Sequence, residues 1–234
     1  MNPQDSLFVL VHDAWHRSWA WQSVAMRLQE RGWSALAIEA SASGDMNLTD
    51  YANAVIEKLQ AYAEYKIILV GHGTGGPVIQ LVADKINNAV GLIFVQAYVL
   101  KSGESVASVM NPETWQLLES LIEDDKLDLA KVPDLWRFGF INDNPKQADE
   151  YLQKLVAESS RLFTEPVHFV ERGLPSAYIS FNEDMSQPNG LFHPQMANKL
   201  GKFRHVNINA SHEGILTKPR EVAEVMIYLA AQAF

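Results

Sequence analysis

The stretch Lys66-Ile-Ile-Leu-Val-Gly-His-Gly-Thr-Gly-Gly76 decides the fold of this chain. It reads as an apolar strand, a glycine-rich turn and the start of a helix. That order is typical of a nucleophile elbow, G-x-S-x-G, in which a sharp turn lifts a side chain above the carboxyl edge of a parallel sheet. The elbow positions here are Gly71, His72, Gly73, Thr74 and Gly75. The central position, a serine in the motif, is therefore glycine.

The same glycines also fit a dinucleotide fingerprint, G-x-G-x-x-G, which must be considered. That fingerprint normally follows the first strand of its unit and needs an acidic residue about 20 residues further on. Here it follows the third expected strand, and the next strand ends Phe94-Val-Gln-Ala-Tyr98 without a carboxylate. We therefore expect no cofactor of this kind.

Short apolar runs alternate with amphipathic runs along the chain, which predicts a parallel α/β sheet in one domain spanning residues 1–234. The expected strands are Leu7–His12, Ala35–Ala40, Lys66–Gly71, Val90–Val99, Ala177–Phe181 and Arg204–Asn209. The expected helices are Trp19–Arg31, Leu48–Tyr62, Pro77–Lys85, Pro194–Leu200 and Pro219–Ala233.

The alternation fails between residues 102 and 172. This segment holds aromatic runs and a helical run, and it contains no convincing strand. It is far longer than an ordinary connection between two strands, which has about 4–6 residues. We interpret it as a helical cap over the carboxyl edge of the sheet.

Composition limits the classes of protein to consider. The 234 residues include 47% hydrophobic and 20% charged residues, as in ordinary soluble domains. A formal net charge of −9 argues against a nucleic-acid partner, and the absence of cysteine excludes disulfides, thiolate metal sites and a cysteine nucleophile. No apolar run approaches the ~20 residues that span a bilayer, and Met1–Ser6 lacks the basic start of a secretion signal. We expect a cytoplasmic protein with a small-molecule substrate, no metal and no membrane partner; a homodimer is compatible with the sequence.

The resemblance to a known family rests on several stretches. Phe8-Val-Leu-Val-His-Asp-Ala-Trp-His-Arg-Ser-Trp-Ala-Trp21 resembles the opening V-L-V-H-G-A-W-H-G-x-W-x-W of the plant methylesterase and hydroxynitrile lyase family and its bacterial esterase relatives. The family's elbow reads V-G-H-S-x-G-G. Further matches are Phe94–Glu104, Ile179–Asp184 and Ala210–Gly214. The resemblance covers nearly the whole chain, is weakest in the cap, and implies the α/β-hydrolase fold: a mostly parallel twisted sheet flanked by helices, with a helical cap and no cofactor.

The family's catalytic positions carry over as Gly73 in the place of the nucleophile, Asp184 as the acid and His212 as the histidine. The resemblance also implies that Ala14 and Thr74 donate backbone N–H groups to an oxyanion hole. Two glycines of the family's first loop are replaced, by Asp13 and Arg17. A single engineered substitution could also produce Gly73, but three neighbouring departures favour natural divergence.

Asp13 has two interpretations. Its carboxylate could point into the site, where at roughly 4 Å and an effective dielectric near 20 it would oppose an oxyanion by about 4 kcal/mol. Kept protonated by an apolar cap, it could instead act as an acid. Alternatively, it points away and accepts hydrogen bonds from loop amides. The expected pocket residues are His12, Trp15, His16, His72, Trp115, Trp136, Phe138, Phe140 and Phe192, although each aromatic could equally be packing.

Three functions remain open. The first is a cofactor-free enzyme in which His212, oriented by Asp184, performs general acid–base chemistry on a small apolar or aromatic substrate: elimination, cyclisation, addition or isomerisation. The second is a carboxylesterase inactivated by glycine at Gly73. The third is a non-catalytic small-molecule binding protein. Cyanohydrin lyase chemistry is disfavoured, because the resemblance implies that this subgroup needs a serine hydroxyl and a lysine after the histidine, where this chain has Glu213.

Overall fold

Six parallel strands form the central sheet of the computed structural model, which describes residues 2–39, 45–188 and 190–233. Their order across the sheet is β2-β1-β3-β4-β8-β9, and every neighbouring pair is parallel. Their bounds are β1 (Ser6–Val11), β2 (Ser34–Ala37), β3 (Lys66–Gly73), β4 (Ala89–Ala97), β8 (Ser176–Phe181) and β9 (Arg204–Ile208). The predicted α/β-hydrolase fold is confirmed.

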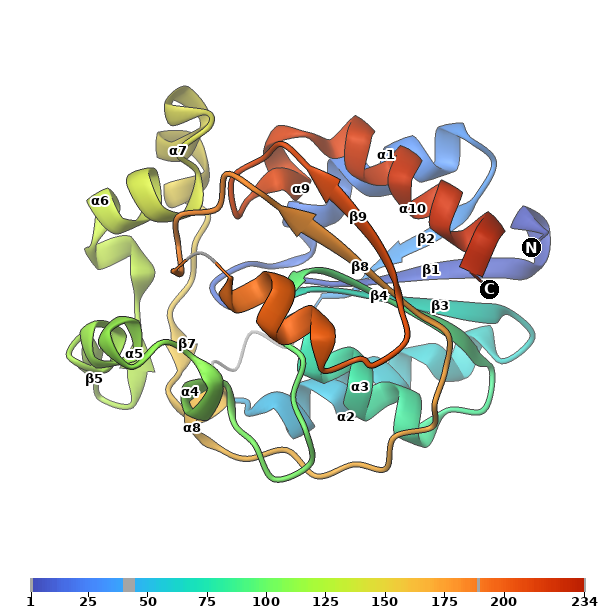
Figure 1. Ribbon diagram of the computed structural model, residues 1–234, viewed down its shortest axis with the longest axis horizontal. Coiled ribbons are helices and arrows are strands. Elements are labelled where there is room, and N and C mark those ends of the chain that lie inside the picture. Colours follow the sequence, from blue (N-terminus) through green and yellow to red (C-terminus); the bar gives the residue numbers. More distant parts are fainter. Residues whose placement is uncertain (1, 40–44, 189, 234) are drawn as a thin grey trace.

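Helices cover both faces of this sheet (Figure 1). On one face α1 (Gln22–Glu30) packs against α10 (Pro219–Ala233), and on the other α2 (Leu48–Leu59) packs against α3 (Gly75–Lys85). β1 is buried along its whole length, as expected for a strand covered on both sides. Its alternate residues therefore belong to two separate hydrophobic cores, one on each face.

The predicted element ends differ from the observed ones by a few residues. The first predicted helix is a 3₁₀ turn, Ser18–Trp21, followed by α1. The helix predicted at Pro194–Leu200 corresponds to a helical turn, Leu191–Met196, that begins earlier and is interrupted at His193. Ala40, the predicted end of the second strand, lies outside the described residues.

The helices of the segment between β4 and β8 lie at one end of the sheet, away from both termini (Figure 1). Its helices are short: α4 (Val106–Val109), α5 (Pro112–Glu119), a 3₁₀ turn (Leu129–Lys131), α6 (Pro133–Leu135), a π-helical turn (Trp136–Phe140), α7 (Pro145–Leu152) and α8 (Arg161–Thr164).

The expectation that this segment lacks strands was wrong. β5 (Ile122–Glu123), β6 (Lys126–Leu127) and β7 (Glu158–Ser159) form a small antiparallel sheet. Strands of two residues are too short to leave an alternating pattern in the sequence. Their pairing also depends on a partner far along the chain, because Leu127 pairs with Glu158.

In the part of the chain that the structure describes, no helix is both long enough and apolar enough to cross a bilayer.

Candidate active site

The turn between β3 and α3 has the geometry of an elbow. Gly73, the last residue of β3, has φ +52°, a left-handed conformation that glycine adopts without the steric penalty of a Cβ atom. A Cβ on Gly76 would lie 2.1 Å from the carbonyl oxygen of Tyr98. The start of α3 therefore packs too closely on the backbone that follows β4 to leave room for a side chain. The turn therefore places residue 73 at the carboxyl edge of the sheet, where α/β proteins bind ligands.

The carboxylate of Asp13 occupies the space in front of Gly73. A Cβ on Gly73 would lie 2.0 Å from both the Cγ and the Oδ2 atoms of Asp13. Asp13 Oδ1 accepts hydrogen bonds from the backbone N–H groups of Ala14, at 2.7 Å, and Thr74, at 2.6 Å. These are the two amides that the sequence predicted as an oxyanion hole, and here both are occupied by Asp13. The carboxylate thus points into the site and also accepts hydrogen bonds from the two loop amides. The two interpretations of Asp13 hold together rather than as alternatives.

His212 joins Asp13 to Asp184. It follows β9 in the loop before the short helix Gly214–Thr217, and its side chain is buried. His212 Nε2 lies 3.1 Å from Asp13 Oδ2, and His212 Nδ1 lies 2.8 Å from Asp184 Oδ2. A single imidazole therefore bridges two carboxylates, one from the loop after β1 and one from the loop after β8.

Protonation of this chain of groups follows from their contacts. Burial would lower the pKa of His212, but the charge of Asp184 and the hydrogen bond with Asp13 raise it well above its ordinary value of 6.5. Burial would raise the pKa of Asp13, but the hydrogen bond with His212 and the neighbouring histidines hold it below its usual range. The pKa of Asp184 is also lowered, because His212 outweighs burial. At neutral pH the site is an imidazolium between two carboxylates. The expectation of a protonated Asp13 acting as an acid was therefore wrong.

Two polar residues that the sequence analysis missed hold Asp184 in place. Gln96 Nε2 donates to Asp184 Oδ2 at 2.6 Å, and the backbone N–H of Ser186 donates to Asp184 Oδ1 at 2.7 Å. Gln96 has φ +41°, which is unusual for a residue other than glycine. The available signal was a polar residue at the end of a buried apolar strand, in the stretch Phe94–Tyr98.

The loop that carries Asp13 is fastened to the segment between β4 and β8. Trp15, at φ +65°, donates its indole N–H to the carbonyl of Leu127, and its own carbonyl accepts from the backbone N–H of Val156. Arg17 forms an ion pair with Glu158 of β7, away from Asp13. These contacts fix the loop in the conformation that presents Asp13 to His212.

Three further histidines, two in this loop and one in β3, are fully or almost fully buried. His12 Nδ1 donates to the carbonyl of Asp13, His16 Nδ1 donates to the carbonyl of Ala14, and His72 Nε2 donates to the carbonyl of His212. Burial lowers the pKa of His12 to about 3 and also lowers that of His72. His16 instead pairs with the buried carboxylate of Glu213 at 3.3 Å, which overcomes burial and raises its pKa.

A small cavity lies over Asp13 and His212. Its volume is about 10 Å³, the space of roughly one water molecule, so a larger ligand requires its walls to move. Most of its lining is apolar or aromatic: Trp15, Tyr98, Met110, Leu118, Phe140, Phe163 and Phe192, with Thr74, Ser186 and Gln187.

The remaining predicted pocket residues lie outside this lining. His12 and His16 are buried in the loop that carries Asp13, and His72 is buried in β3. Trp136 is fully buried and donates to the carbonyl of Ala148, and the ring of Trp115 packs beside that of Phe163. The side chain of Phe138 is exposed. Trp136 and Trp115 thus pack behind the cavity wall, because the short helices of this segment turn them toward its own core.

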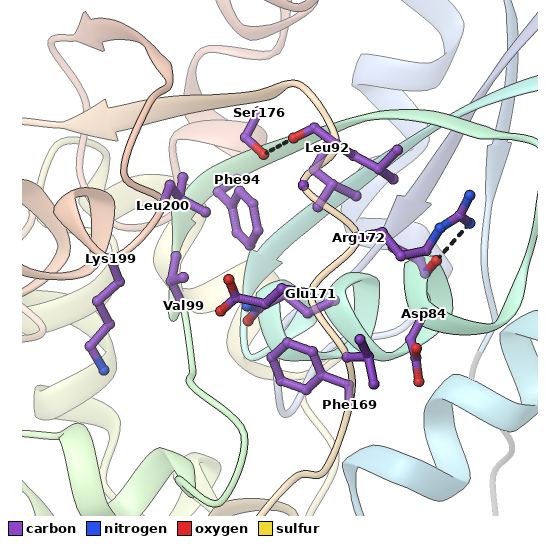
Figure 2. A pocket seen from close by; sticks show the side chains of 15 residues that line it. Asp84, Leu92, Phe94, Val99, Phe169, Glu171, Arg172, Ser176, Lys199 and Leu200 are labelled. Carbon is purple, nitrogen blue, oxygen red and sulfur yellow. Dashed lines mark hydrogen bonds between the residues drawn. The ribbon is translucent and has the colours of Figure 1, made fainter.

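Other cavities lie nearby, and two charged groups of the first already have partners. Figure 2 shows a pocket of about 90 Å³ beside α3, where Phe94, Val99 and Leu200 lie together. Its Lys199 pairs with Glu104, and its Arg172 donates to the carbonyl of Ala83. A cavity of about 310 Å³ is lined in part by Asp184, Gln96 and His205. The cavity over Asp13 and His212 is the candidate active site because it is lined by both of these residues.

One group in the described part of the chain has donor atoms close enough to share a metal ion: those of Asp13, His72 and His212 lie within 4.8 Å of one another. His212 Nε2 already lies 3.1 Å from Asp13 Oδ2, and His212 Nδ1 faces Asp184. A metal ion bound by His212 would have to replace one of these two contacts.

Comparisons with known proteins agree with this fold. The model of the alpha/beta hydrolase family matches residues 8–225. Methylesterase 2 of Arabidopsis thaliana is 29% identical, with 95% of each chain covered, and norfluorocurarine synthase 2 of a Strychnos species is 27% identical, with 96% of this chain and 95% of the relative covered. An extracellular alpha/beta-hydrolase from a Paenibacillus species superposes with a TM-score of 0.89 at 24% identity, covering 95% of this chain and 98% of that one. The match across most of the chain shows that it belongs to the alpha/beta hydrolase family.

Proposed function

We propose that this chain is an enzyme that transfers protons on a small apolar or aromatic substrate, with His212 as the proton donor and Asp184 as the residue that orients it. The observation that carries the proposal is the position of Asp13, whose carboxylate binds both loop amides and the Nε2 edge of His212 beneath an apolar cavity. In this arrangement an imidazolium donates a proton and a carboxylate accepts one, as elimination, isomerisation, cyclisation and addition all require.

The relatives support an enzyme without choosing the reaction. Methylesterases and a synthase match the chain at similar identity and coverage. The occupied amides argue against the second function, an esterase that has only lost its serine at position 73. An ester hydrolase needs those N–H groups free for its oxyanion, whereas here they stabilise a carboxylate.

The test uses exchange of an acidic C–H bond. We expect the protein to exchange the α-protons of phenylacetone in D₂O, followed by NMR, because His212 can donate to the ketone oxygen while Asp13 accepts the α-proton. His212→Ala should lower the exchange rate by at least about a hundredfold, and Asp184→Asn by a comparable factor.

The binding protein remains the alternative outcome. If phenylacetone shifts the melting temperature while exchange stays at the buffer rate, the proton-transfer function is wrong and the chain is a receptor. Equal exchange in the His212→Ala variant would also overturn the proposed role of His212.

A further inference from the structure

Gln187 separates the candidate active site from two larger cavities. It lies in the loop after β8 that also carries Asp184, and it is only 8% exposed. Among the described lining residues, it is the only one shared by the cavity over His212, the 310 Å³ cavity and a third cavity of about 800 Å³. The space over His212 holds roughly one water molecule, so a ligand of ordinary size needs room from a neighbouring cavity. Both larger cavities can supply that room where Gln187 now lies.

The amide oxygen of Gln187 is buried without a hydrogen-bond donor among the described residues. A buried acceptor without a partner is unfavourable, because it has lost its hydrogen bonds to water. Movement of this side chain therefore breaks no hydrogen bond of that oxygen and gives it access to donors. By contrast, Phe192, which also lines the cavity, packs against the rings of Tyr98 and His212 and would lose those contacts. A ligand can thus displace Gln187 at little cost, and the freed oxygen can accept a hydrogen bond from it.

The third cavity is rich in hydrogen-bond acceptors and in negative charge. Asp143 and Glu183 contribute carboxylates, and Asn142 contributes an amide whose oxygen is also buried without a partner. Asp143 accepts hydrogen bonds from Ser211 and from the hydroxyl of Thr217, which are neutral donors. None of the described residues that line this cavity is basic, and within the described ranges neither carboxylate forms an ion pair. The charge of this cavity is therefore not compensated.

The candidate active site adds negative charge next to this cavity. Asp184 lines the third cavity, and Ser186 lines both spaces, with its Oγ atom 3.2 Å from His212 Nδ1. At neutral pH the imidazolium of His212 lies between the carboxylates of Asp13 and Asp184. Two negative charges and one positive charge leave this group negative. A protonated amine beside Gln187 is therefore attracted by both spaces, whereas a carboxylate there is repelled.

We propose that the substrate of this enzyme is an organic cation, with its reacting apolar or aromatic end over His212 and a protonated amine in the third cavity. The part of the substrate between these two ends takes the place of the Gln187 side chain, whose freed amide oxygen accepts a hydrogen bond from the amine. The carboxylates of Asp143 and Glu183 supply the opposite charge. This inference rests on the proposed function for the reaction at His212, and it adds the charge and the length of the substrate.

Two matched ketones test the charge of the substrate. One is the para-dimethylaminoethyl derivative of phenylacetone, which is protonated at neutral pH and carries one N–H donor. The other is the para-isopentyl derivative, in which a CH group replaces the nitrogen, so that size and shape are kept. We expect the amine to bind the unaltered protein at least about tenfold more tightly in isothermal titration calorimetry at low salt. The difference should shrink as salt screens the charges.

Variants locate the amine. Glu183→Gln removes one carboxylate of the third cavity with little change in size, so it should weaken binding of the amine by about threefold or more and leave the isopentyl derivative unchanged. The matched control is Glu57→Gln, at an exposed position of α2 outside the three cavities, which changes the net charge equally. Gln187→Leu keeps the bulk of the wall but removes the acceptor, so it should weaken binding of the amine more than that of the isopentyl derivative.

Equal affinity of the two ketones for the unaltered protein would overturn the cationic substrate. An equal weakening of the amine by Glu57→Gln and Glu183→Gln would do the same, because the overall charge would then explain the preference. If phenylacetone exchanges its α-protons while the amine binds no better than its isostere, the substrate class is wrong and the proton-transfer function stands. If the amine binds more tightly through Glu183 but no ketone exchanges above the buffer rate, the third cavity binds cations and the proton-transfer function is wrong.

Discussion

The carboxylate of Asp13 and a side chain at residue 73 cannot occupy the site together, because a Cβ on Gly73 would lie 2.0 Å from Asp13 Cγ. Asp13 is itself held by three hydrogen bonds, from Ala14, Thr74 and His212. The residues at positions 13 and 73 are therefore coupled. Only glycine at position 73 leaves room for the Asp13 carboxylate to reach His212. A substitution at either position therefore changes what the other residue can do.

Gly73→Ala tests this coupling through stability. We expect the variant to lose about 1–3 kcal/mol of unfolding free energy, as in overpacked sites, because its methyl group displaces the Asp13 carboxylate. The loss should be smaller when Asp13→Gly is also present. Chemical denaturation of the two single variants and the double variant gives the coupling, which we expect to exceed about 0.5 kcal/mol. Additive losses would show that Asp13 moves aside freely.

Gln96→Met tests whether Gln96 positions Asp184. Its side-chain N–H donates to Asp184 Oδ2 at 2.6 Å, but Gln96 does not line the cavity over Asp13. We expect kcat to fall about tenfold or more, since a hydrogen bond to a charged group contributes about 1.5–3 kcal/mol, while KM stays unchanged.

The matched control is Gln80→Met. Gln80 is also a buried glutamine that bonds backbone groups, here both polar groups of Leu100, without touching Asp184. The Gln80→Met variant should have an unchanged kcat even if it lowers the stability of the protein. An equal loss of kcat in both variants would show that Gln96 acts through packing of the interior and does not position Asp184.

The sequence predicted the fold well because the fold depends on local signals. Apolar runs such as Lys66–Gly71 mark buried parallel strands whatever their neighbours are, and the glycine turn after β3 is visible as a motif. The strands β5, β6 and β7 were missed because two-residue strands carry no pattern and form only through pairing between distant segments.

The sequence named several residues that meet at this site, but neither the residues that hold Asp184 nor the bonding of Asp13. Asp13, Ala14, Thr74 and His212 were all named, yet the carboxylate was expected either to enter the site or to accept loop amides. The structure combines the two, since one oxygen faces the amides and the other faces His212. A sequence cannot reveal that division, because it depends on where the loop after β1 lies relative to Gly73.

The protonation of His212 can be observed directly. Because the charge of Asp184 and the hydrogen bond with Asp13 raise its pKa well above 6.5, both ring nitrogens should carry protons at pH 7. We expect imidazolium ¹⁵N shifts for His212 in the NMR spectrum. His205 is the internal control, since partial burial and the nearby His193 lower its pKa and it should be neutral.

The sign of the pH effect on stability follows. The pKa of His212 is higher in the folded protein than its ordinary value of 6.5 in the unfolded chain. Protonated His212 therefore contributes its full stabilisation at pH values below 6.5. That contribution is lost as the pH rises through the pKa of the folded protein. His16 contributes in the same direction through Glu213, so His212→Gln should remove only part of the decline. Neutral-tautomer shifts for His212 at pH 7 would contradict the ion pair with Asp13.

The pair of His16 and Glu213 should matter more for stability than any surface ion pair. Both side chains are fully buried, so Glu213→Ala leaves His16 without its counter-charge. We expect a loss of about 3–5 kcal/mol of unfolding free energy at pH 6, where His16 is protonated. The control is Glu224→Ala, which breaks the exposed pair with Arg31 and should cost less than about 1 kcal/mol. Similar losses in both variants would show that burial of the His16 pair does not determine its contribution.

Gly73→Ser distinguishes a diverged site from a disabled esterase. If only a nucleophile were missing, this variant would hydrolyse a short-chain aryl ester, since His212 and Asp184 already stand in the required order. We expect it to remain poor, because its Cβ meets the Asp13 carboxylate and that carboxylate still fills both oxyanion amides. The double variant, Gly73→Ser with Asp13→Gly, frees the amides and the space together. It should therefore exceed the single variant by more than about tenfold in kcat/KM, a non-additive gain typical of groups that act as a unit. The unaltered protein and the double variant should also differ toward a serine-directed phosphonate, with a stoichiometric adduct only in the latter. Efficient ester hydrolysis by the Gly73→Ser variant alone would mean that Asp13 yields its place readily, and the esterase that lost its serine would then be the better account of this chain.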